Sequence, residues 1–205
     1  MEPIILVGGG GHCSSCIDVI EQEARFEIAG IVDMPEEIGT SLLGYPVVGS
    51  DDDLPQLTEK YRYFLITLGQ IKTPQRRIQI CRQLQQLGAE LPTIVSSRAY
   101  ISRHAEVGAG TIVMHNVIVN AGAKVGENCI LNSCALIEHD AIVGNYCHIS
   151  TGATINGGTQ IAEGTFVGSG SVIRDNTRVG SYSLIGGGVS VMEEVPDKTI
   201  YTGRK

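Results

Sequence analysis

Two different spacings of apolar residues run along this chain, and the change falls near Thr93. Before that point, short apolar runs cover Ile4–Val7 and Tyr63–Leu68, and a further strand-like segment covers Glu27–Val32. Each run is followed directly by Gly or Asp, as expected for a buried parallel strand that ends in a loop. The first part of the chain is therefore predicted to contain three buried strands.

Helical patterns separate these predicted strands. Ser14 and Ser15 are candidate N-caps for a helix that ends before Phe26, and Thr73 is a candidate cap for a helix that reaches Gly88. Pro74 at the first position of the second helix fits this assignment. Strands that alternate with helices form a small parallel sheet, so residues 1–94 are predicted to be a Rossmann-like α/β domain.

From Arg103 onward the chain repeats every six residues. Fifteen consecutive hexads place an aliphatic residue at the fifth position without one insertion, and the third position is almost always Ala, Cys, Thr or Ser. The fifth positions are Val107, Val113, Val119, Val125, Leu131, Ile137, Val143, Ile149, Ile155, Ile161, Val167, Ile173, Val179, Ile185 and Val191. A six-residue repeat is the signature of a parallel β-helix, and a flexible Gly-rich segment would not keep an unbroken aliphatic column.

This repeat defines the second domain, residues 95–205. Each hexad supplies one short strand and a turn, three hexads close one triangular coil, and eighteen residues separate stacked positions. The aliphatic residue points inward and stacks on its equivalents in neighbouring coils. The composition agrees, because 26 Gly, no Trp and only three Phe leave a core of Val, Ile and small residues.

Charge and cysteine content exclude several classes of function. The net charge of −7 argues against nucleic acid or an anionic membrane as a partner, since both attract basic surfaces. No apolar run has the length of a signal sequence or a membrane span, so we expect a cytoplasmic protein. The six cysteines, including the closely spaced Cys13 and Cys16, are interpreted as reduced thiols, and no metal site is predicted.

Both parts of the chain together resemble one known family. The segments "ILVGGGGH", "IVD", "ITLGQ" and "LIEHDAIVGNYCHIS" occur in the order seen in the sialic-acid O-acetyltransferase and bacillosamine N-acetyltransferase family, the NeuD/PglD type. The resemblance implies a left-handed parallel β-helix, a homotrimer, and acetyl-CoA as cosubstrate in the cleft between adjacent subunits. It also implies that the N-terminal domain binds the acceptor, a nucleotide-activated amino sugar.

His139 is the candidate general base. Acetyl transfer needs a group that accepts the proton of the acceptor, and histidine titrates near neutrality. His139 opens its hexad and should lie near a corner of the coil, at the surface. The family has His-Glu at this place, so the resemblance implies that His139 is the base and Asp140 its carboxylate partner, with Glu138 as a rival. Without the motif, a solvated surface histidine is the alternative.

The resemblance also implies coenzyme contacts. His148 matches a histidine that contacts acetyl-CoA, and it lies half a coil from His139, so a neighbouring subunit would have to bring the two together. Gly157, Ser169 and Gly187 match positions beside the pantetheine arm, although Gly also serves the turns of this fold. Asn132 is a candidate hydrogen-bond donor to the acceptor in the cleft.

Two further histidines and the end of the chain do not match the family. His104 and His115 match no known motif and are expected to be solvated. The family's closing Gly-x-Pro-Ala-Lys/Arg is replaced by Tyr201-Thr202-Gly203-Arg204-Lys205, which leaves contacts to the far end of the coenzyme open.

A glycine loop follows the first predicted strand. Backbone N–H groups of such a loop before a helix can hold phosphates, and Asp33 ends the next strand where an acid can read a ribose. Cys13 stands where a third Gly would complete a dinucleotide fingerprint, so an NAD site is the weaker alternative. The resemblance implies instead that the acceptor contacts Gly10, Gly11, His12, Asp33, Met34 and Gly69.

The predicted function is acetyl transfer from acetyl-CoA to a UDP-linked 4-amino-4,6-dideoxy sugar. An alternative within the same enzyme class is O-acetylation of a sialic-acid-type hydroxyl. A third hypothesis is a non-catalytic accessory protein, in which the β-helix serves assembly and the N-terminal domain senses a sugar nucleotide.

Overall fold

The computed structural model describes residues 1–203, and Arg204 and Lys205 of the C-terminal tail lie outside the described residues. Contacts divide the chain into two compact units. The N-terminal unit comprises Met1–Gly69 and Gln75–Ile94, and the β-helix unit comprises Gln70–Pro74 together with the chain from Val95 onward. A short segment of the first ninety residues thus packs with the β-helix.

The N-terminal unit is built on a twisted sheet in the order β3-β4-β2-β1-β5. Its strands are β1 (Glu2–Val7), β2 (Phe26–Val32), β3 (Ser41–Leu42), β4 (Tyr45–Gly49) and β5 (Tyr63–Ile66). All neighbours pair in parallel except the short β3, which runs antiparallel to β4. The three predicted strands are β1, β2 and β5, whereas β3 and β4 had no clear signal in the sequence.

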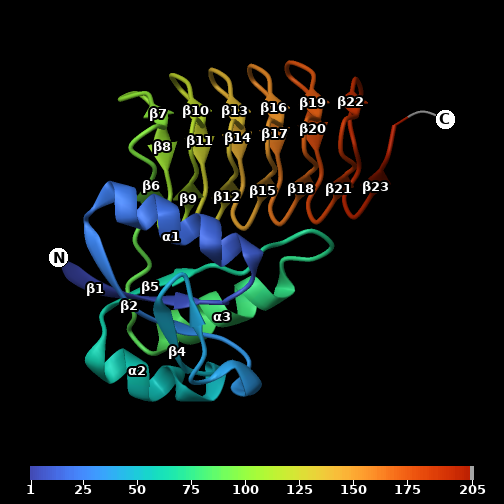
Figure 1. Cartoon of the computed structure of the whole chain (residues 1–205). Coiled ribbons are helices and arrows are strands. Elements are labelled where there is room, and N and C mark those ends of the chain that lie inside the picture. The colour runs from blue at the N-terminus through green and yellow to red at the C-terminus, as the bar shows by residue number, and fades with distance from the viewer. Residues whose placement is uncertain (204–205) are drawn as a thin grey trace. The chain divides into compact units, whose positions relative to one another are not determined.

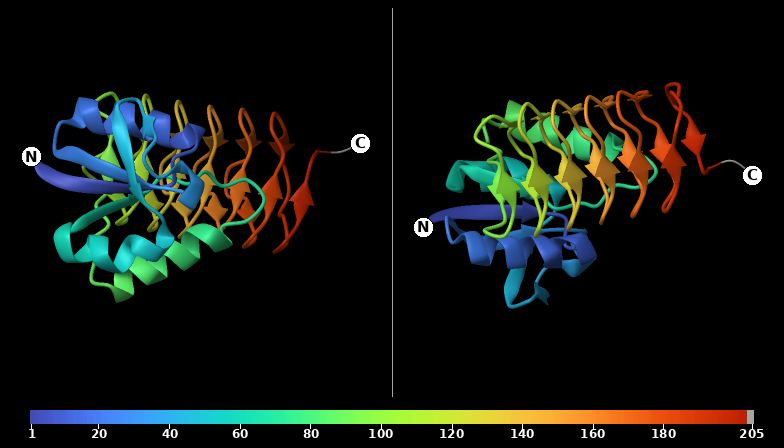
Figure 2. Two further views of the ribbon diagram at one scale, coloured as in Figure 1. Left: turned by 60° about the horizontal axis from the view of Figure 1, so that its bottom comes forward. Right: turned by 90° about the horizontal axis from the view of Figure 1, so that it is seen from above.

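Helices cover both faces of this sheet. Helix α1 (Gly11–Glu23) lies on one face, and α2 (Leu54–Lys60) and α3 (Gln75–Gln86) lie on the other (Figures 1 and 2). Two short 3-10 helices span Pro35–Glu37 and Asp51–Asp53. The N-cap of α1 is Gly10, which has extended backbone, so the prediction of an N-cap at Ser14 or Ser15 was wrong. The glycine loop therefore leads straight into the helix, and His12 and Cys13 lie in its first turn.

The second unit is a left-handed parallel β-helix whose strands are two residues long and stack as coils (Figure 1). Each strand pairs with the strand eighteen residues further on, as Ile118 pairs with Leu136 and Val119 with Ile137. Three sheets result, which we name the apolar face, the polar face and the His148 face.

The apolar face contains β7 (Tyr100–Ile101), β10 (Ile118–Val119), β13 (Leu136–Ile137), β16 (Thr154–Ile155), β19 (Val172–Ile173) and β22 (Ser190–Val191). The polar face contains β8 (Glu106–Val107), β11 (Lys124–Val125), β14 (Ile142–Val143), β17 (Gln160–Ile161) and β20 (Arg178–Val179). The His148 face contains β6 (Ile94–Val95), β9 (Ile112–Val113), β12 (Ile130–Leu131), β15 (His148–Ile149), β18 (Phe166–Val167), β21 (Leu184–Ile185) and β23 (Ile200–Tyr201).

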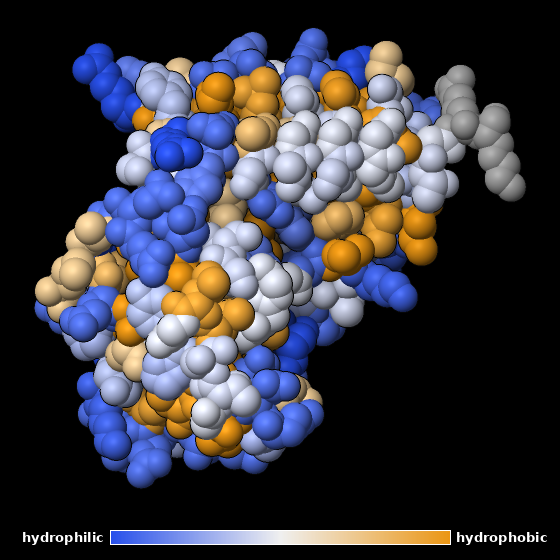
Figure 3. Space-filling model, viewed as in Figure 1, coloured by the Kyte–Doolittle hydropathy of each residue, from blue (hydrophilic) through white to orange (hydrophobic). Residues whose placement is uncertain are grey.

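The aliphatic column predicted from the hexads forms the core of this unit. Every fifth-position residue is buried except Val107 in the first coil, which is half-buried. The outward residues of the strands differ from face to face. The apolar face presents Tyr100, Ile118 and Val172, which are 59%, 40% and 39% exposed, whereas the polar face presents mostly charged and amide side chains. Figure 3 shows orange hydrophobic residues exposed on the coils between blue polar ones.

The small third-position residues link each coil to the next. The hydroxyl of Thr165 donates to the carbonyl of Gly180 at 2.7 Å, and the thiol of Cys147 donates to the carbonyl of Ala162 at 3.1 Å. Thr111, Cys129, Thr159 and Ser171 make the same bond to the carbonyl fifteen residues ahead. Thr, Ser and Cys recur at this position because their side chains are small and still satisfy a buried carbonyl.

None of the six cysteines forms a disulfide bond. Burial raises the pKa of Cys13 to about 11 and raises that of Cys16 still further, so neither thiolate forms at neutral pH. Among residues 1–203, no helix is both long enough and apolar enough to cross a membrane.

Candidate functional site

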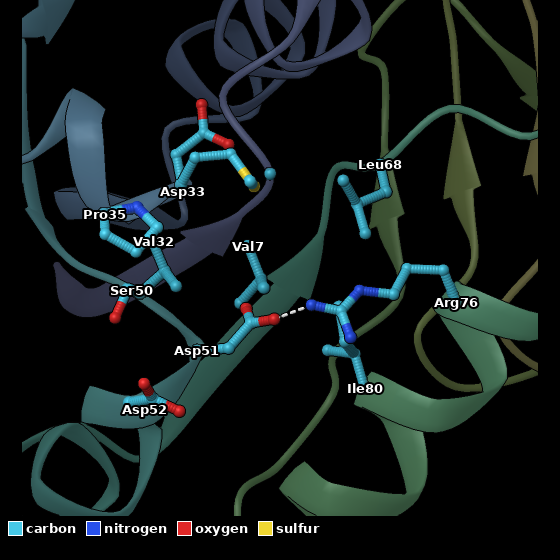
Figure 4. Close-up of a pocket in the computed structure, with 12 residues that line it drawn as sticks. Val7, Val32, Asp33, Pro35, Ser50, Asp51, Asp52, Leu68, Arg76 and Ile80 are labelled. Atoms are coloured by element: carbon cyan, nitrogen blue, oxygen red, sulfur yellow. Dashed lines mark hydrogen bonds and ion pairs between the residues drawn. The ribbon is translucent and has the colours of Figure 1, made fainter.

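A cavity of about 250 Å³ lies at the carboxyl edge of the sheet in the N-terminal unit (Figure 4). Its lining residues follow the strands: Gly8 follows β1, Asp33 follows β2, Ser50 follows β4 and Leu68 follows β5. The chain adds β2 and β4 on one side of β1 and then returns to place β5 on the other side. Such a switch point opens a crevice at the strand ends, where ligands of open α/β sheets bind.

Charged side chains surround this cavity. Asp33, Asp51 and Asp52 contribute carboxylates, and Arg76 from α3 pairs with Asp51 across the opening (Figure 4). The next residue, Arg77, is 1% exposed, and its Nη1 donates to the carbonyls of Ile66 and Leu68 at 3.2 and 2.7 Å. Arg77 thus fixes the end of β5 beside the cavity. Neither arginine was predicted from the sequence, because nothing in a helical pattern marks the buried guanidinium of Arg77 or the partner of the exposed Arg76.

The acceptor residues predicted from the sequence divide between this cavity and its approach. Asp33 and Met34 line the cavity, whereas Gly10, Gly11, His12 and Gly69 do not. The glycine loop nevertheless adjoins Asp33, because a Cβ on Gly9 would lie 2.4 Å from the Asp33 carboxylate. Gly10 and Gly11 are exposed at the start of α1, where backbone N–H groups point out of the helix. Gly69 lies beside His12, because a Cβ added to the glycine would lie 3.8 Å from the Cβ of the histidine.

In the β-helix unit, His139 lies at the corner between the apolar and polar faces, which we call the His139 corner. Its Nδ1 lies 2.9 Å from Oδ2 of Asp140. A carboxylate oxygen accepts, so Nδ1 carries the proton and Nε2 of the neutral ring holds the lone pair. The ring is thus prepared to accept a proton at Nε2.

The residues around His139 explain why this ring lies where it does. Asp140 has a positive φ of 59°, and it stacks on Gly122, whose added Cβ would meet the Asp140 carboxylate at 2.3 Å. One coil further on, a Cβ on Gly157 would lie 2.6 Å from Nε2 of His139. Gly157 therefore leaves the space that the imidazole occupies. A pocket of about 280 Å³ here is lined by His139, Asp140, Gly157, Gly158, Asp175 and Asn176.

The electrostatics of this corner favour the imidazolium form. The hydrogen bond to Asp140 is the largest cause that raises the pKa of His139, and the charges of Asp140, Glu138 and Asp175 add to it. Glu138 is turned elsewhere: its carboxylate accepts from Asn120 Nδ2 at 2.9 Å and from the backbone N–H of His139 at 3.2 Å. The ring partner is therefore Asp140, while Asp175 is a pocket residue that was not predicted from the sequence.

A second polar cluster lies on and beside the His148 face. The Nδ1 atom of His148 donates to the backbone carbonyl of Gln70 at 2.6 Å, and Nε2 lies 3.4 Å from Nδ2 of Asn132. The Phe166 ring packs edge-on at 5.1 Å. His148 is only 7% exposed, so its ring is held on three sides.

Ser169 and Gly187 lie one above the other at the corner between the His148 face and the apolar face, which we call the Ser169 corner. The hydroxyls of Ser169 and Ser150 are hydrogen-bonded at 2.8 Å. A Cβ on Gly187 would lie 3.3 Å from the Ser169 carbonyl, so this position is tight for any larger residue. Asn132 begins the same corner two coils earlier.

The structure thus separates the predicted residues of the β-helix into two groups. His139, Asp140 and Gly157 share the His139 corner, while Asn132, His148, Ser169 and Gly187 gather at or near the Ser169 corner. The apolar face lies between these corners. One copy of the chain therefore does not place His148 beside His139.

The other two histidines of this unit have different surroundings. His104 is exposed and accepts from Nε of Arg103 at 3.0 Å, as expected for a surface side chain. The expectation that His115 is solvated was wrong, because it is half-buried and its Nδ1 lies 2.6 Å from the hydroxyl of Ser96. Ser96 is 2% exposed and also accepts from the backbone N–H of Arg98, so this pair stabilises a turn and does not present a nucleophile.

No site for a metal ion is evident in the part of the chain that the structure describes. Across residues 1–203, the His, Cys, Asp and Glu side chains form no group of three that could hold one.

Comparisons with known proteins place the chain among sugar acetyltransferases. The family model "PglD N-terminal domain" matches residues 3–84, and the model "Bacterial transferase hexapeptide (six repeats)" matches residues 122–157. Comparison with curated protein sequences returned no significant match.

Two solved structures cover nearly the whole chain. PerB from Caulobacter crescentus, solved with CoA and GDP-perosamine, is 28% identical, with 96% of this chain and 92% of that chain covered and a TM-score of 0.89. The acetyltransferase domain of PglB from Neisseria gonorrhoeae, solved with acetyl coenzyme A, is also 28% identical, with 98% and 96% covered and a TM-score of 0.88. The two family models, the order of the two units and these similarities identify the chain as a hexapeptide-repeat acetyltransferase that is similar over nearly its whole length to NeuD/PglD-type sugar acetyltransferases.

Proposed function

We propose that the protein transfers the acetyl group of acetyl-CoA to the amino group of a nucleotide-linked amino sugar. The observation that carries this proposal is the imidazole of His139, whose Nδ1–H is bonded to Asp140 and whose Nε2 lies over Gly157 in an open pocket. The similarity to PerB, which was solved with CoA and GDP-perosamine, and to a PglB domain solved with acetyl coenzyme A supports the same chemistry.

In the proposed reaction, Nε2 of His139 accepts a proton from the sugar amine. The amine nitrogen attacks the thioester carbonyl carbon, and a tetrahedral intermediate forms. The C–S bond then breaks, and the leaving thiolate takes the proton from the His139 imidazolium. The products are an N-acetylated sugar and free CoA. Asp140 holds the imidazole in the required tautomer and stabilises its positive charge.

The acceptor site of this proposal is the cavity at the carboxyl edge of the N-terminal sheet, with the exposed start of α1 beside it. The N–H groups at Gly10 and Gly11 suit a diphosphate, and the carboxylate of Asp33 suits hydroxyl or N–H donors of a nucleoside. His12, Met34 and Gly69 complete the proposed contacts. UDP is the expected nucleotide, with a 4-amino-4,6-dideoxy sugar as the acceptor, and a GDP-linked sugar is the alternative that the PerB complex supports.

The coenzyme site of this proposal is the Ser169 corner. His148, Ser169 and Gly187 would contact the pantetheine arm, and Asn132 would donate to a ligand in the cleft. Gly157 was also expected to contact the coenzyme. It lies next to the His139 ring, so in this proposal its first role is to leave space for the base.

A homotrimer completes the proposed site. If three copies pack their apolar faces around a threefold axis, the His139 corner of each copy meets the Ser169 corner of the next. The exposed Ile118 and Val172 side chains on this face support such packing, because burying them is favourable and the polar face offers no comparable stripe. Each active site would then combine the base of one copy with the coenzyme cluster of another. We expect a cytoplasmic location for this assembly, and six cysteines that form no disulfide fit a reducing compartment.

Activity of a His139→Ala variant tests the proposed base. We expect kcat for acetylation to fall by a factor of about 100 to 10,000, the range of general base catalysis. His104→Ala is the matched control, because His104 is an exposed histidine of the same unit outside the proposed site. Wild-type turnover by the His139→Ala variant would remove the base from the mechanism.

Acceptor pairs that differ only in an amine or a hydroxyl test the class of transfer. Acetylation of the amine and not of the hydroxyl is expected, for UDP-linked and GDP-linked sugars measured side by side. Transfer to the hydroxyl instead would establish O-acetylation, and sugar-nucleotide binding without any acetyl-CoA binding would favour an accessory role.

A further inference from the structure

Gln70 joins a short segment that precedes α3 to the coils of the β-helix. It opens the segment Gln70–Pro74, which packs with the β-helix unit, and its side chain is 3% exposed. The Nε2 atom donates to the carbonyl of Tyr146 at 3.0 Å and to the carbonyl of Gly164 at 3.4 Å. These two carbonyls belong to stacked corners of successive coils. The Gln70 amide therefore fixes the segment Gln70–Pro74 at one position along the axis of the β-helix.

The same residue contacts His148 through its backbone. The carbonyl oxygen of Gln70 lies 2.6 Å from Nδ1 of His148, and a carbonyl can only accept. Nδ1 of His148 must therefore carry a proton. The neutral ring then has its lone pair on Nε2.

The surroundings of Nε2 agree with this tautomer. Asn132 accepts from the backbone N–H of Ser133 through Oδ1 at 2.8 Å, so its Nδ2 group is the one that faces His148. An amide N–H facing Nε2 at 3.4 Å requires a lone pair there. Two independent neighbours thus assign the same tautomer to one ring.

We propose that Gln70 is a positioning residue that fixes His148 with Nδ1 protonated, so that Nε2 presents an acceptor to the coenzyme. This role rests on the proposed function, in which His148 faces acetyl-CoA. An Nε2 lone pair accepts from an amide N–H, and the pantetheine arm carries two such groups. His148 would then bind the arm, and the N–H donors of the thioester oxyanion would come from elsewhere.

The identity of the side chain matters to this role because only its donor end is used. The other amide atom, Oε1, is buried without a hydrogen-bond partner among residues 1–203. In Gln70→Glu, a carboxylate oxygen would replace Nε2 and face two carbonyl oxygens. Repulsion between these oxygens would move the segment, and with it the backbone carbonyl of position 70, away from the β-helix. Gln70→Met removes the donor without adding charge.

Histidine ¹⁵N NMR on the full-length protein, together with steady-state kinetics, tests the proposal. In the wild type, His148 is expected as a single tautomer protonated at Nδ1, assigned by its absence in His148→Gln. In both Gln70 variants this tautomer should be lost or mixed. The KM for acetyl-CoA should rise about five- to tenfold, the equivalent of one hydrogen bond, while the KM for the amino sugar stays within about twofold.

The control is Gln160→Ala, an exposed glutamine on the polar face, which should change neither the His148 signals nor the KM values. An unchanged His148 tautomer in both Gln70 variants would overturn the proposal. So would a lost tautomer with an unchanged KM for acetyl-CoA in a protein that uses this cosubstrate. If the wild type does not bind acetyl-CoA but the tautomer still depends on Gln70, the positioning role stands and the proposed function fails.

Discussion

A Cβ atom on Gly157 would lie 2.6 Å from Nε2 of His139, which is closer than any real Cβ contact. These residues are eighteen positions apart, on adjacent coils of the same corner. The imidazole therefore occupies the volume that any side chain at position 157 would fill. Gly157, which has no side chain, therefore determines where the ring of the proposed base can lie.

Gly157→Ala should consequently displace the His139 ring. We expect kcat/KM to fall by about tenfold to a hundredfold, because a misplacement of about 1 Å costs this much in an oriented reaction. Gly186→Ala serves as the control, since a Cβ there meets only ordinary contacts at 3.4 Å or more. Both variants should keep the circular dichroism spectrum of the wild type. Equal activity of the two variants would show that the ring position is not set by Gly157.

Asp140→Asn tests the electrostatic link between the carboxylate and the base. The hydrogen bond to Asp140 raises the pKa of His139 above its ordinary value of 6.5, and catalysis requires the neutral ring. The acidic limb of the pH profile of kcat/KM should therefore lie above pH 6.5 in the wild type. Loss of the carboxylate charge lowers the pKa, so the limb should move to lower pH.

Glu138→Gln provides the comparison for this experiment. The charge of Glu138 raises the pKa of His139 less than Asp140 does, and its carboxylate bonds Asn120. The acidic limb of the pH profile of kcat/KM should therefore move less in Glu138→Gln than in Asp140→Asn. A larger shift in Glu138→Gln would assign the partner role to Glu138.

Ile118→Glu tests the proposed subunit interface. Ile118 is 40% exposed on the apolar face, and a threefold axis would bring three introduced carboxylates together in a desolvated surface. The mass measured by light scattering should fall from three times 21.8 kDa toward 21.8 kDa, and activity should be lost with it.

Ile142→Glu is a closely matched control for that experiment. Ile142 has the same residue type, a similar exposure of 44% and the equivalent strand position, but it lies on the polar face. It should leave the mass unchanged. Dissociation caused by Ile142→Glu and not by Ile118→Glu would assign the interface to the other face.

Asp33→Asn tests the acceptor cavity. The Asp33 carboxylate lies beside the glycine loop, and replacing it by an amide removes a charge-assisted acceptor. The KM for the nucleotide sugar should rise about tenfold, while the KM for acetyl-CoA stays unchanged. Glu36→Gln, in the exposed 3-10 helix that follows, is the control. A rise confined to the KM for acetyl-CoA would contradict the assignment of the cavity to the acceptor.

The sequence predicts the β-helix almost completely, because the six-residue repeat determines both the strands and the way that they stack. An inward aliphatic every six residues admits one arrangement, and the pairing of Ile118 with Leu136 follows from it. The N-terminal unit is less determined. β4 begins with Tyr45 and Pro46, so it lacks a continuous apolar run, and the start of α1 at Gly11 overrides the usual preference for a Ser cap.

The candidate site was predicted in part for a similar reason. His139 and Asp140 are neighbours in the sequence, so their contact is local and a motif can reveal it. Asp175 joins the His139 pocket only because the coils stack, and Gln70 joins His148 only through the packing of a distant segment. Arg77 is invisible to patterns, since a buried guanidinium in a helix breaks the rule that charges face water.

The stacking of the coils also limits how this protein can change in length. Each turn of eighteen residues advances the rod by one rung, about 4.8 Å. An insertion of one whole turn between Asp140 and His148 would keep every aliphatic inside but raise the second histidine by one rung. An insertion that is not a multiple of six residues would turn core positions outward, and one of six or twelve residues would carry His148 to another face of the coil. Insertions that keep both the core and the three faces are therefore limited to multiples of eighteen residues, and the axial offset of the two imidazoles changes only in whole rungs.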